Sequence, residues 1–189
     1  MFEIEVDENI HLRMFTIKDS EELYVLTMKN KEHLRKWLGW IHPYYSIEDS
    51  KNFIRHSLDL AVKNGGIPLG FAVLYKNKIV GTIDFHSVNQ ANRSASIGYW
   101  LAETHVGKGI MSKAFQAMLQ YGFERLKLNR IEVRAAEGNI KSRAIPERFG
   151  FVEEGKIREA EWLYDHYVDH IVYSMLKREW EQLKKKVID

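Results

Sequence analysis

Cysteine is absent from this chain of 189 residues. Without a thiol, the protein can form no disulfide, no thiolate metal site and no acyl-cysteine intermediate. A chain without disulfides fits a reducing compartment, and we expect a cytoplasmic location. Internal repeats, low-complexity segments and linkers rich in Pro, Gly or Ser are also missing, which favours one folded domain over residues 1–189.

Long hydrophobic runs and an excess of one charge are missing as well. Lys or Glu interrupts every apolar stretch before it reaches the length of a membrane span. Residues 1–5 are acidic and alternating, a pattern unlike that of a secretory signal. With 28 Lys and Arg against 26 Asp and Glu, the formal net charge is +2. We therefore expect neither a membrane nor nucleic acid among the partners.

What the chain does contain is the periodicity of an ordinary globular protein. Helical spacing is clearest from Ile110 to Leu126, where apolar residues recur every three or four positions. Shorter patterns predict strands at residues 10–14, 69–75, 78–85, 95–101, 131–135, from 151, and at 167–176, and helices after 16–20, after 46, at 139–149 and at 177–186. This order predicts a mixed α/β sheet in which antiparallel meanders alternate with crossover helices.

A glycine turn, Gly107-Lys108-Gly109-Ile110-Met111-Ser112, precedes the clearest helix. Glycine readily adopts positive φ, so successive backbone N–H groups can point at phosphate oxygens while the helix adds the positive end of its dipole. The spacing fits neither a P-loop nor a dinucleotide-binding fingerprint. A tight loop between a strand and a helix would also use glycine, so the turn alone does not distinguish an anion site from a connection.

A second helix start, Asn139-Ile140-Lys141-Ser142, follows after an intervening strand. Two helix N-termini beside neighbouring strands form an anion site and a small polar pocket. Acetyl-CoA, which carries a pyrophosphate and a thioester, matches such a pair and indicates acyl transfer. Asn139 and Ser142 are equally typical of a helix cap, which is the alternative interpretation.

In combination, these segments resemble the GNAT N-acetyltransferase superfamily, and most closely its RimJ/RimL type of ribosomal-protein N-terminal acetyltransferases. The resemblance extends from about Ile10 to Leu176 and rests on Lys29–Lys31, Ile97–Leu101, Gly107–Ser112, Asn139 with Ser142, and Ala160–Leu163. It implies a single GNAT domain whose mixed, mostly antiparallel sheet has six to seven strands, is flanked by helices and splays at the strand that ends near Leu101. It also implies acetyl-CoA as co-substrate, no metal, and a homodimer.

The resemblance assigns acetyl-CoA binding to the end of that strand and to both helix starts. The implied residues are Tyr99, Trp100, Leu101, Gly107, Lys108, Gly109, Ile110, Met111, Ser112, Asn139 and Ser142. A backbone N–H near Tyr99 to Leu101 is the expected oxyanion donor. One position departs from the family, which usually has Gln or Arg where this chain has Thr104. Because backbone groups make most of the phosphate contacts, we expect reduced stringency there and retained binding.

Without cysteine, the acceptor amine attacks the thioester directly. The amine must lose a proton, the oxyanion must be stabilised, and the departing thiolate must be protonated or hydrogen-bonded. Many family members carry a tyrosine acid where this chain has Pro146, which has no proton to donate. The resemblance implies that Ser142 hydrogen-bonds the sulfur, with Asn139 beside it.

The proton acceptor must lie elsewhere. Glu161 matches the RimJ/RimL-type glutamate that accepts the amine proton, through water. A carboxylate has an ordinary pKa near 4.3 and is a weak base at pH 7, and the alternative is a plain surface glutamate. His86, at a strand end, is a second candidate base. His166 and His170 would lie about 13 Å apart on a strand, too far to share a metal ion.

Four aromatic residues and a proline lie close together in the first third of the chain: Trp37, Trp40, Pro43, Tyr44 and Tyr45. Core packing is one explanation. The resemblance places this region beside the acceptor groove, so substrate binding by Trp37, Trp40 and Tyr44 is the other.

The expected activity is acetyl transfer to a primary amine, with the N-terminal amine of a ribosomal protein as the favoured acceptor. One alternative is a small amine such as a polyamine or an aminoglycoside. Another is a noncatalytic acyl-CoA-binding protein, which the presence of both Ser142 and Glu161 disfavours.

Overall fold

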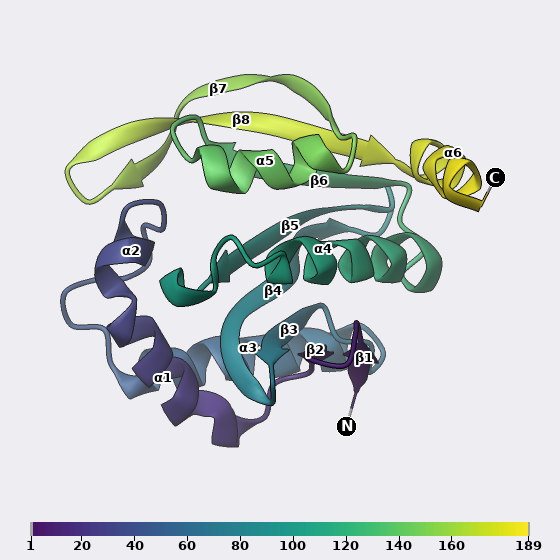
Figure 1. Ribbon diagram of the computed structural model, residues 1–189. Coiled ribbons are helices and arrows are strands. Elements are labelled where there is room, and N and C mark those ends of the chain that lie inside the picture. The colour runs from purple at the N-terminus through teal and green to yellow at the C-terminus, as the bar shows by residue number, and fades with distance from the viewer. Residues whose placement is uncertain (1, 189) are drawn as a thin grey trace. The chain divides into compact units, whose positions relative to one another are not determined.

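The computed structural model describes residues 2–188, with side chains described as far as Lys185 (Figure 1). Eight strands pair in the order β1-β2-β3-β4-β5-β6-β8-β7. Their bounds are β1 Glu3–Glu5, β2 Ile10–Arg13, β3 Gly70–Tyr75, β4 Lys78–Asn89, β5 Ser94–Leu101, β6 Arg130–Ala136, β7 Val152–Leu163 and β8 His166–Leu176. The mixed, mostly antiparallel α/β fold is thereby confirmed. The sheet exceeds the expected six to seven strands because β1, which contains one apolar residue, pairs with β2.

The helical elements alternate with these strands as expected. They are η1 Ile17–Asp19, α1 Ser20–Lys29, α2 Lys31–Arg35, α3 Ile47–Lys63, η2 Glu103–His105, α4 Ile110–Gln120, η3 Tyr121–Arg125, α5 Ile140–Arg148 and α6 Lys177–Ile188. The long helix predicted from Ile110 to Leu126 changes to a wider turn at η3. Gly122 lies in this turn, where a Cβ would come within 2.7 Å of Phe85 and 2.8 Å of Ile131. The absence of a side chain is what permits that close packing.

The chain forms two compact units. The first unit comprises Met1–Asp84 and Tyr99–Ala114, and the second comprises Phe85–Gly98 and Phe115–Asp189. Residues 1 and 189 themselves lie outside the described residues. The single domain over residues 1–189 stays a prediction.

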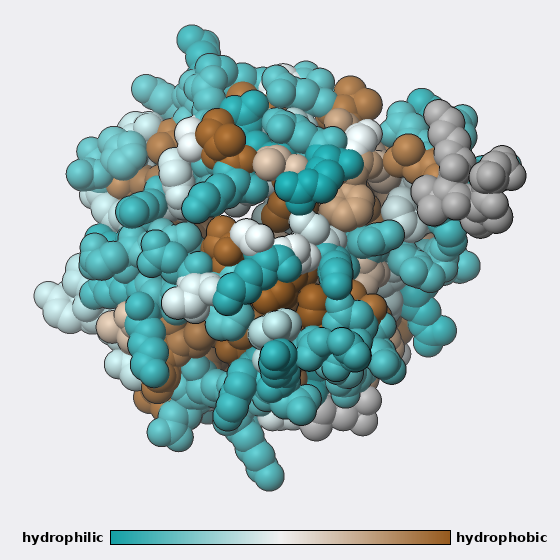
Figure 2. Space-filling view, in the orientation of Figure 1, coloured by the Kyte–Doolittle hydropathy of each residue, from teal (hydrophilic) through white to brown (hydrophobic). Residues whose placement is uncertain are grey.

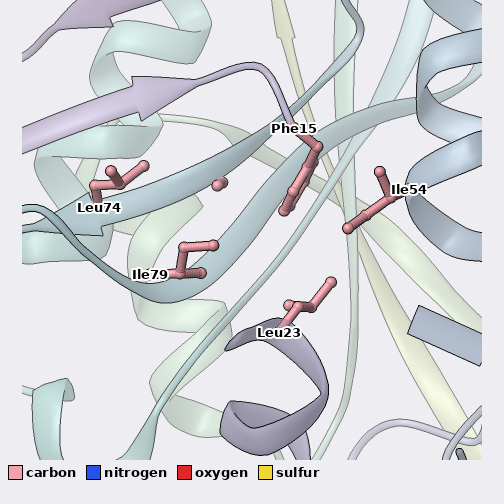
Figure 3. Packing of buried hydrophobic residues seen from close by; sticks show 6 residues of the cluster. Phe15, Leu23, Ile54, Leu74 and Ile79 are labelled. Atoms are coloured by element: carbon pink, nitrogen blue, oxygen red, sulfur yellow. The ribbon is translucent and has the colours of Figure 1, made fainter. Parts of the chain in front are cut away.

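The core of the first unit forms where α1 and α3 pack on β2, β3 and β4. Figure 3 shows the buried cluster, which consists of Phe15, Leu23, Ile54, Ala72, Leu74 and Ile79. Burying each of the larger side chains contributes roughly 1.5–3 kcal/mol. Capping boxes at Thr16 and Ser46 fix the helix starts that supply this apolar surface. Lys76 and Asn77, with φ of 50° and 64°, close the β3–β4 hairpin between the strands predicted at 69–75 and 78–85.

In the second unit, α5 packs on β6 and β8 (Figure 1). Arg143 of α5 donates from Nε to the hydroxyl oxygen of Tyr173 at 2.8 Å, and that hydroxyl donates to Glu147 at 2.7 Å. Tyr173 is buried, and its burial raises the pKa of its phenol. This network fixes the start of α5 to the middle of β8.

Strands β5 and β6 are parallel. Their pairing joins Ser94–Ser96 to Arg130–Glu132. It therefore involves the first three residues of β5, as expected for a strand that splays near Leu101.

One face of the molecule is mostly polar (Figure 2). Figure 2 shows hydrophilic side chains over most of one face, with apolar residues in small groups. Among the described residues, no helix combines the length and apolar character that crossing a bilayer requires.

Candidate functional site

The glycine turn of the first unit has the backbone geometry that the sequence predicts. Gly107 and Gly109 have φ of 82° and 76°, a left-handed conformation that side chains disfavour. A Cβ at either position would meet no atom within 4 Å. The glycines are thus required by conformation, and the space beside them is open.

Helix α4 begins directly on this turn. The carbonyl of Gly109 accepts a hydrogen bond from the N–H of Lys113 at 3.1 Å, so a residue without a side chain occupies the N-cap position. Ile110 and Met111 are buried, and their side chains anchor the helix. Of these two predicted cofactor residues, only backbone groups are available to a ligand. Lys108 is exposed.

The charges around this helix start are partly paired. Lys113 binds Asp7 at 2.7 Å, which raises the pKa of the lysine and lowers that of the aspartate. Burial, followed by repulsion from Lys108, lowers the pKa of His105. Thr104, the departure from the family pattern, contacts the His105 ring at 3.0 Å. The lowered pKa favours the neutral form of the His105 ring, two residues before Gly107.

The end of β5 is held by a close backbone contact that the sequence did not indicate. A Cβ on Gly81 of β4 would lie 2.2 Å from the carbonyl oxygen of Trp100. Two residues after Trp100, the N–H of Ala102 donates to the carbonyl oxygen of Val80 at 2.8 Å. Of the predicted residues at this strand end, Tyr99 and Trp100 are half-buried and Leu101 is buried.

The predicted acceptor residues have different surroundings. The Trp40 ring lies 6.5 Å from that of Trp100 and 5.7 Å from that of Tyr45, so it belongs to an aromatic cluster. Tyr44 is 88% exposed, which excludes core packing as its explanation. Trp37 is half-buried. Asn30, in the motif beside them, accepts a hydrogen bond from the N–H of Glu103 at 2.8 Å and so ties α1 to η2.

The second helix start uses a side chain. Asn139 Oδ1 accepts a hydrogen bond from the N–H of Ser142 at 3.3 Å and caps α5. Asn139 is therefore a helix cap, as the alternative interpretation expected, and this does not exclude a role beside the sulfur. Ser142 is half-buried on the first turn, and Pro146, one turn later, is buried inside the helix. Pro146 has no N–H to donate to the carbonyl of Ser142, as the helical pattern would otherwise require.

Glu161 pairs with His170, a residue whose sequence position had been tested only for metal binding. Its Oε2 lies 3.1 Å from Nε2 of His170 on the neighbouring strand. The side chains are 35% and 17% exposed, so the pair lies at the edge of the buried region. The adjacent Trp162 is 51% exposed and packs edge-on against Tyr167, away from any core.

The described residues contain no group of three or more His, Cys, Asp or Glu side chains arranged to hold a metal ion. His166 contacts Asp165, and His170 contacts Glu161. The two histidines are therefore engaged separately.

A family model for the acetyltransferase (GNAT) domain matches residues 9–152. The chain belongs to the GNAT acetyltransferase family. This acetyltransferase is also 41% identical to a Bacillus subtilis (strain 168) protein named "Putative ribosomal N-acetyltransferase YdaF", over 96% of this chain and 98% of the relative.

Two solved structures extend the likeness to the whole acetyltransferase fold. The RimL ribosomal L7/L12 α-N-protein acetyltransferase in complex with coenzyme A superposes with a TM-score of 0.86 at 27% identity, covering 93% of this chain and 98% of that one. The microcin C7 self-immunity acetyltransferase MccE, in complex with acetyl-CoA and AMP, superposes with a TM-score of 0.83 at 34% identity. The match covers 92% of this chain and 95% of that one. The resemblance to the RimJ/RimL type is thus confirmed, and the protein is an enzyme that transfers acetyl groups.

The predicted residues of this acetyltransferase fall into two sets. The end of β5, the glycine turn and the aromatic cluster belong to the first unit, whereas Asn139, Ser142 and Glu161 belong to the second. Sequence reasoning missed Gly81 and the pairing of His170. A glycine inside a strand pattern is a signal for the former. The latter depends on strand register, which the pattern of β7 does not fix.

Proposed function

We propose that this protein catalyses direct transfer of an acetyl group from acetyl-CoA to a primary amine, with the N-terminal amine of a ribosomal protein as acceptor. The choice of donor rests on one observation. The turn that precedes α4 contains two glycines with positive φ, Gly107 and Gly109, and the space beside both is open. The coenzyme A and acetyl-CoA bound in RimL and MccE support the same donor.

The pyrophosphate of the donor would bind at the first helix start. Backbone N–H groups of the turn, together with Lys108, would hold the pyrophosphate, since a helix N-terminus attracts anions. Such a contact contributes roughly 0.3–2 kcal/mol, whereas micromolar binding requires about 8 kcal/mol. The end of β5 would supply further contacts, including a backbone N–H for the oxyanion.

The chemical step would use the second unit. Ser142 would hydrogen-bond the departing sulfur with Asn139 beside it, and Glu161 would take part in accepting the proton of the amine. The nitrogen then bonds to the thioester carbon, the C–S bond breaks, and the sulfur leaves as a thiol. Pro146 cannot serve as the acid.

The acceptor assignment rests on the relatives and on the exposed aromatic side chains. RimL is named for ribosomal L7/L12, and the relative from Bacillus subtilis for a ribosomal substrate. Trp37, Trp40 and Tyr44 would contact the acceptor. The cytoplasmic location and the homodimer stay predictions.

A small amine is the second candidate acceptor. The bound AMP in MccE favours it, because aromatic rings such as Trp40 and Tyr44 can stack on a flat ligand.

Release of free thiol from acetyl-CoA distinguishes these acceptors. The purified protein is incubated with a panel of peptides bearing ribosomal N-termini and a panel of small amines. We expect turnover with at least one peptide and mass addition at its N-terminal amine. Turnover confined to small amines would overturn the ribosomal acceptor. Binding of acetyl-CoA without thiol release from any member would overturn the proposed reaction.

A further inference from the structure

Glu161 faces His170 because the β7–β8 ladder contains a bulge. Ile157 pairs with His170, but Glu161 pairs with Val168, so three residues of β7 lie opposite Asp169 alone. In a regular ladder Glu161 would pair with His166, about 7 Å further along the strand. The bulge therefore brings the carboxylate to this imidazole.

The bulge is built from specific contacts. Glu159 has φ of 49°, an uncommon conformation for a residue with a side chain. Its N–H donates to Oδ1 of Asp169 at 2.9 Å, and Asp169 also lies 3.6 Å from Lys156. Bulges of this kind commonly re-aim a side chain beside an active site.

Other charges on this face of the sheet are already paired. On β6, Arg134 binds Glu132 at 2.6 Å, and Arg130 binds both Glu132 and Glu154 of β7. Arg130 lowers the pKa of Glu154 to about 2. Among the residues that the structure describes, Glu161 is paired with the His170 ring and makes no ion pair with an Arg or Lys side chain.

Two charged residues of the bulge precede Glu161 in the chain. Arg158 and Glu159 belong to the bulge and are exposed, while Ala136 is the residue of β6 opposite His170. In the described part of the chain, neither Nδ1 of His170 nor Oε1 of Glu161 has a hydrogen-bond partner. Both atoms are available to a substrate or to water.

We propose that His170 accepts the proton of the amine and that Glu161 orients the His170 ring. A carboxylate only accepts hydrogen bonds, so Nε2 of the neutral ring carries the hydrogen and the lone pair lies on Nδ1. The inference rests on the acetyl transfer proposed above.

The proton balance is complete with these groups. The ammonium form of the acceptor gives one proton to Nδ1, directly or through one water. The amine attacks the thioester carbon, its second proton goes to the departing sulfur, and the C–S electron pair stays on that sulfur. The imidazolium, stabilised by the carboxylate of Glu161, then returns its proton to water.

The pH profile of kcat tests this role. Wild type, His170→Gln, Glu161→Gln and the control His166→Gln are compared at saturating acetyl-CoA and acceptor. His166 lies on the same strand, is exposed and pairs with Asp165. We expect His170→Gln to lower kcat by about 100-fold, to leave KM for acetyl-CoA within twofold, and to remove the acid limb of the profile. Added imidazole should partly rescue His170→Ala. Glu161→Gln should lower kcat by about tenfold, and the kcat of His166→Gln should match that of wild type.

Two results would overturn the inference while acetyl transfer stands. One is an unchanged kcat and acid limb in His170→Gln, and the other is a much larger loss in Glu161→Gln than in His170→Gln. A measurement independent of turnover is the 15N NMR tautomer state of His170 at pH 8. We expect Nε2–H in wild type, and an Nδ1–H tautomer would exclude the proposed geometry. Thiol release from no acceptor by wild type would instead contradict the proposed function.

Discussion

Helices α4 and α5 begin in opposite ways. At α4 the N-cap position is Gly109, which has no side chain, and its positive φ leaves open space beside the turn. At α5 the N-cap is Asn139, whose side chain takes the N–H of Ser142. Relative to Asn, a glycine at the N-cap costs roughly a few tenths of a kcal/mol, and it leaves the first amide groups of the helix for a ligand. The contrast suggests that the first start binds an anion and that the second positions a hydroxyl.

The largest effect expected from this contrast is on turnover. Ser142→Ala should lower kcat by about 100-fold and leave KM for acetyl-CoA within twofold, because a proton donor in the transition state is lost. Ser142→Thr retains a hydroxyl and serves as the control. Steady-state kinetics with the acceptor found in the panel checks the prediction. Unchanged turnover in Ser142→Ala would reduce the second helix start to a structural cap.

The next effect is on donor binding. Gly109→Ala should raise KM for acetyl-CoA by about tenfold, since a side chain strains the left-handed turn that aims the amide groups. Gly66→Ala is a matched control, because Gly66 has φ of 84° and equally open space but follows α3. Both variants should lose similar stability, and only Gly109→Ala should weaken binding. Equal KM values in the two would mean that the α4 turn is an ordinary connection.

The two helix starts also show how far the sequence could be interpreted. Both were predictable because glycine and asparagine encode local conformation. Strand β1 was missed because the alternation over residues 1–5 is too short, with one apolar side chain within Glu3–Glu5, to predict a strand. The strand pattern beyond Phe151 was predicted, but its register was not.

Contacts between residues that are distant in the sequence were not predicted either, because they depend on strand register. Gly81 is needed because the carbonyl of Trp100 approaches it. A glycine inside a strand indicates a close approach, but the local pattern does not identify the neighbour. The pairing of Glu161 with His170 depends on the bulge opposite Asp169. Propensity and spacing report on single segments, whereas register is decided by tertiary contacts.

A smaller effect is expected on stability. Asn139→Ala should lower the free energy of unfolding by about 1 kcal/mol, because the N–H of Ser142 loses its acceptor. Asn139→Asp retains a cap oxygen and should stay within about 0.5 kcal/mol of wild type. Denaturant titration checks both variants. If Asn139→Ala reduces kcat without reducing stability, the side chain acts on the substrate and the cap is incidental.

The smallest effect is electrostatic and reports on the first helix start. Burial and Lys108 lower the pKa of His105, so the unfolded chain protonates first and the free energy of unfolding falls as pH drops below about 6.5. An anion beside Lys108 offsets that repulsion, so coenzyme A should raise the pKa of His105. An NMR titration of His105 with and without coenzyme A measures the shift, and Lys108→Ala should raise the pKa before any ligand is added. A pKa that coenzyme A leaves unchanged would move the anion away from this turn, and the contrast between α4 and α5 would then be one of capping alone.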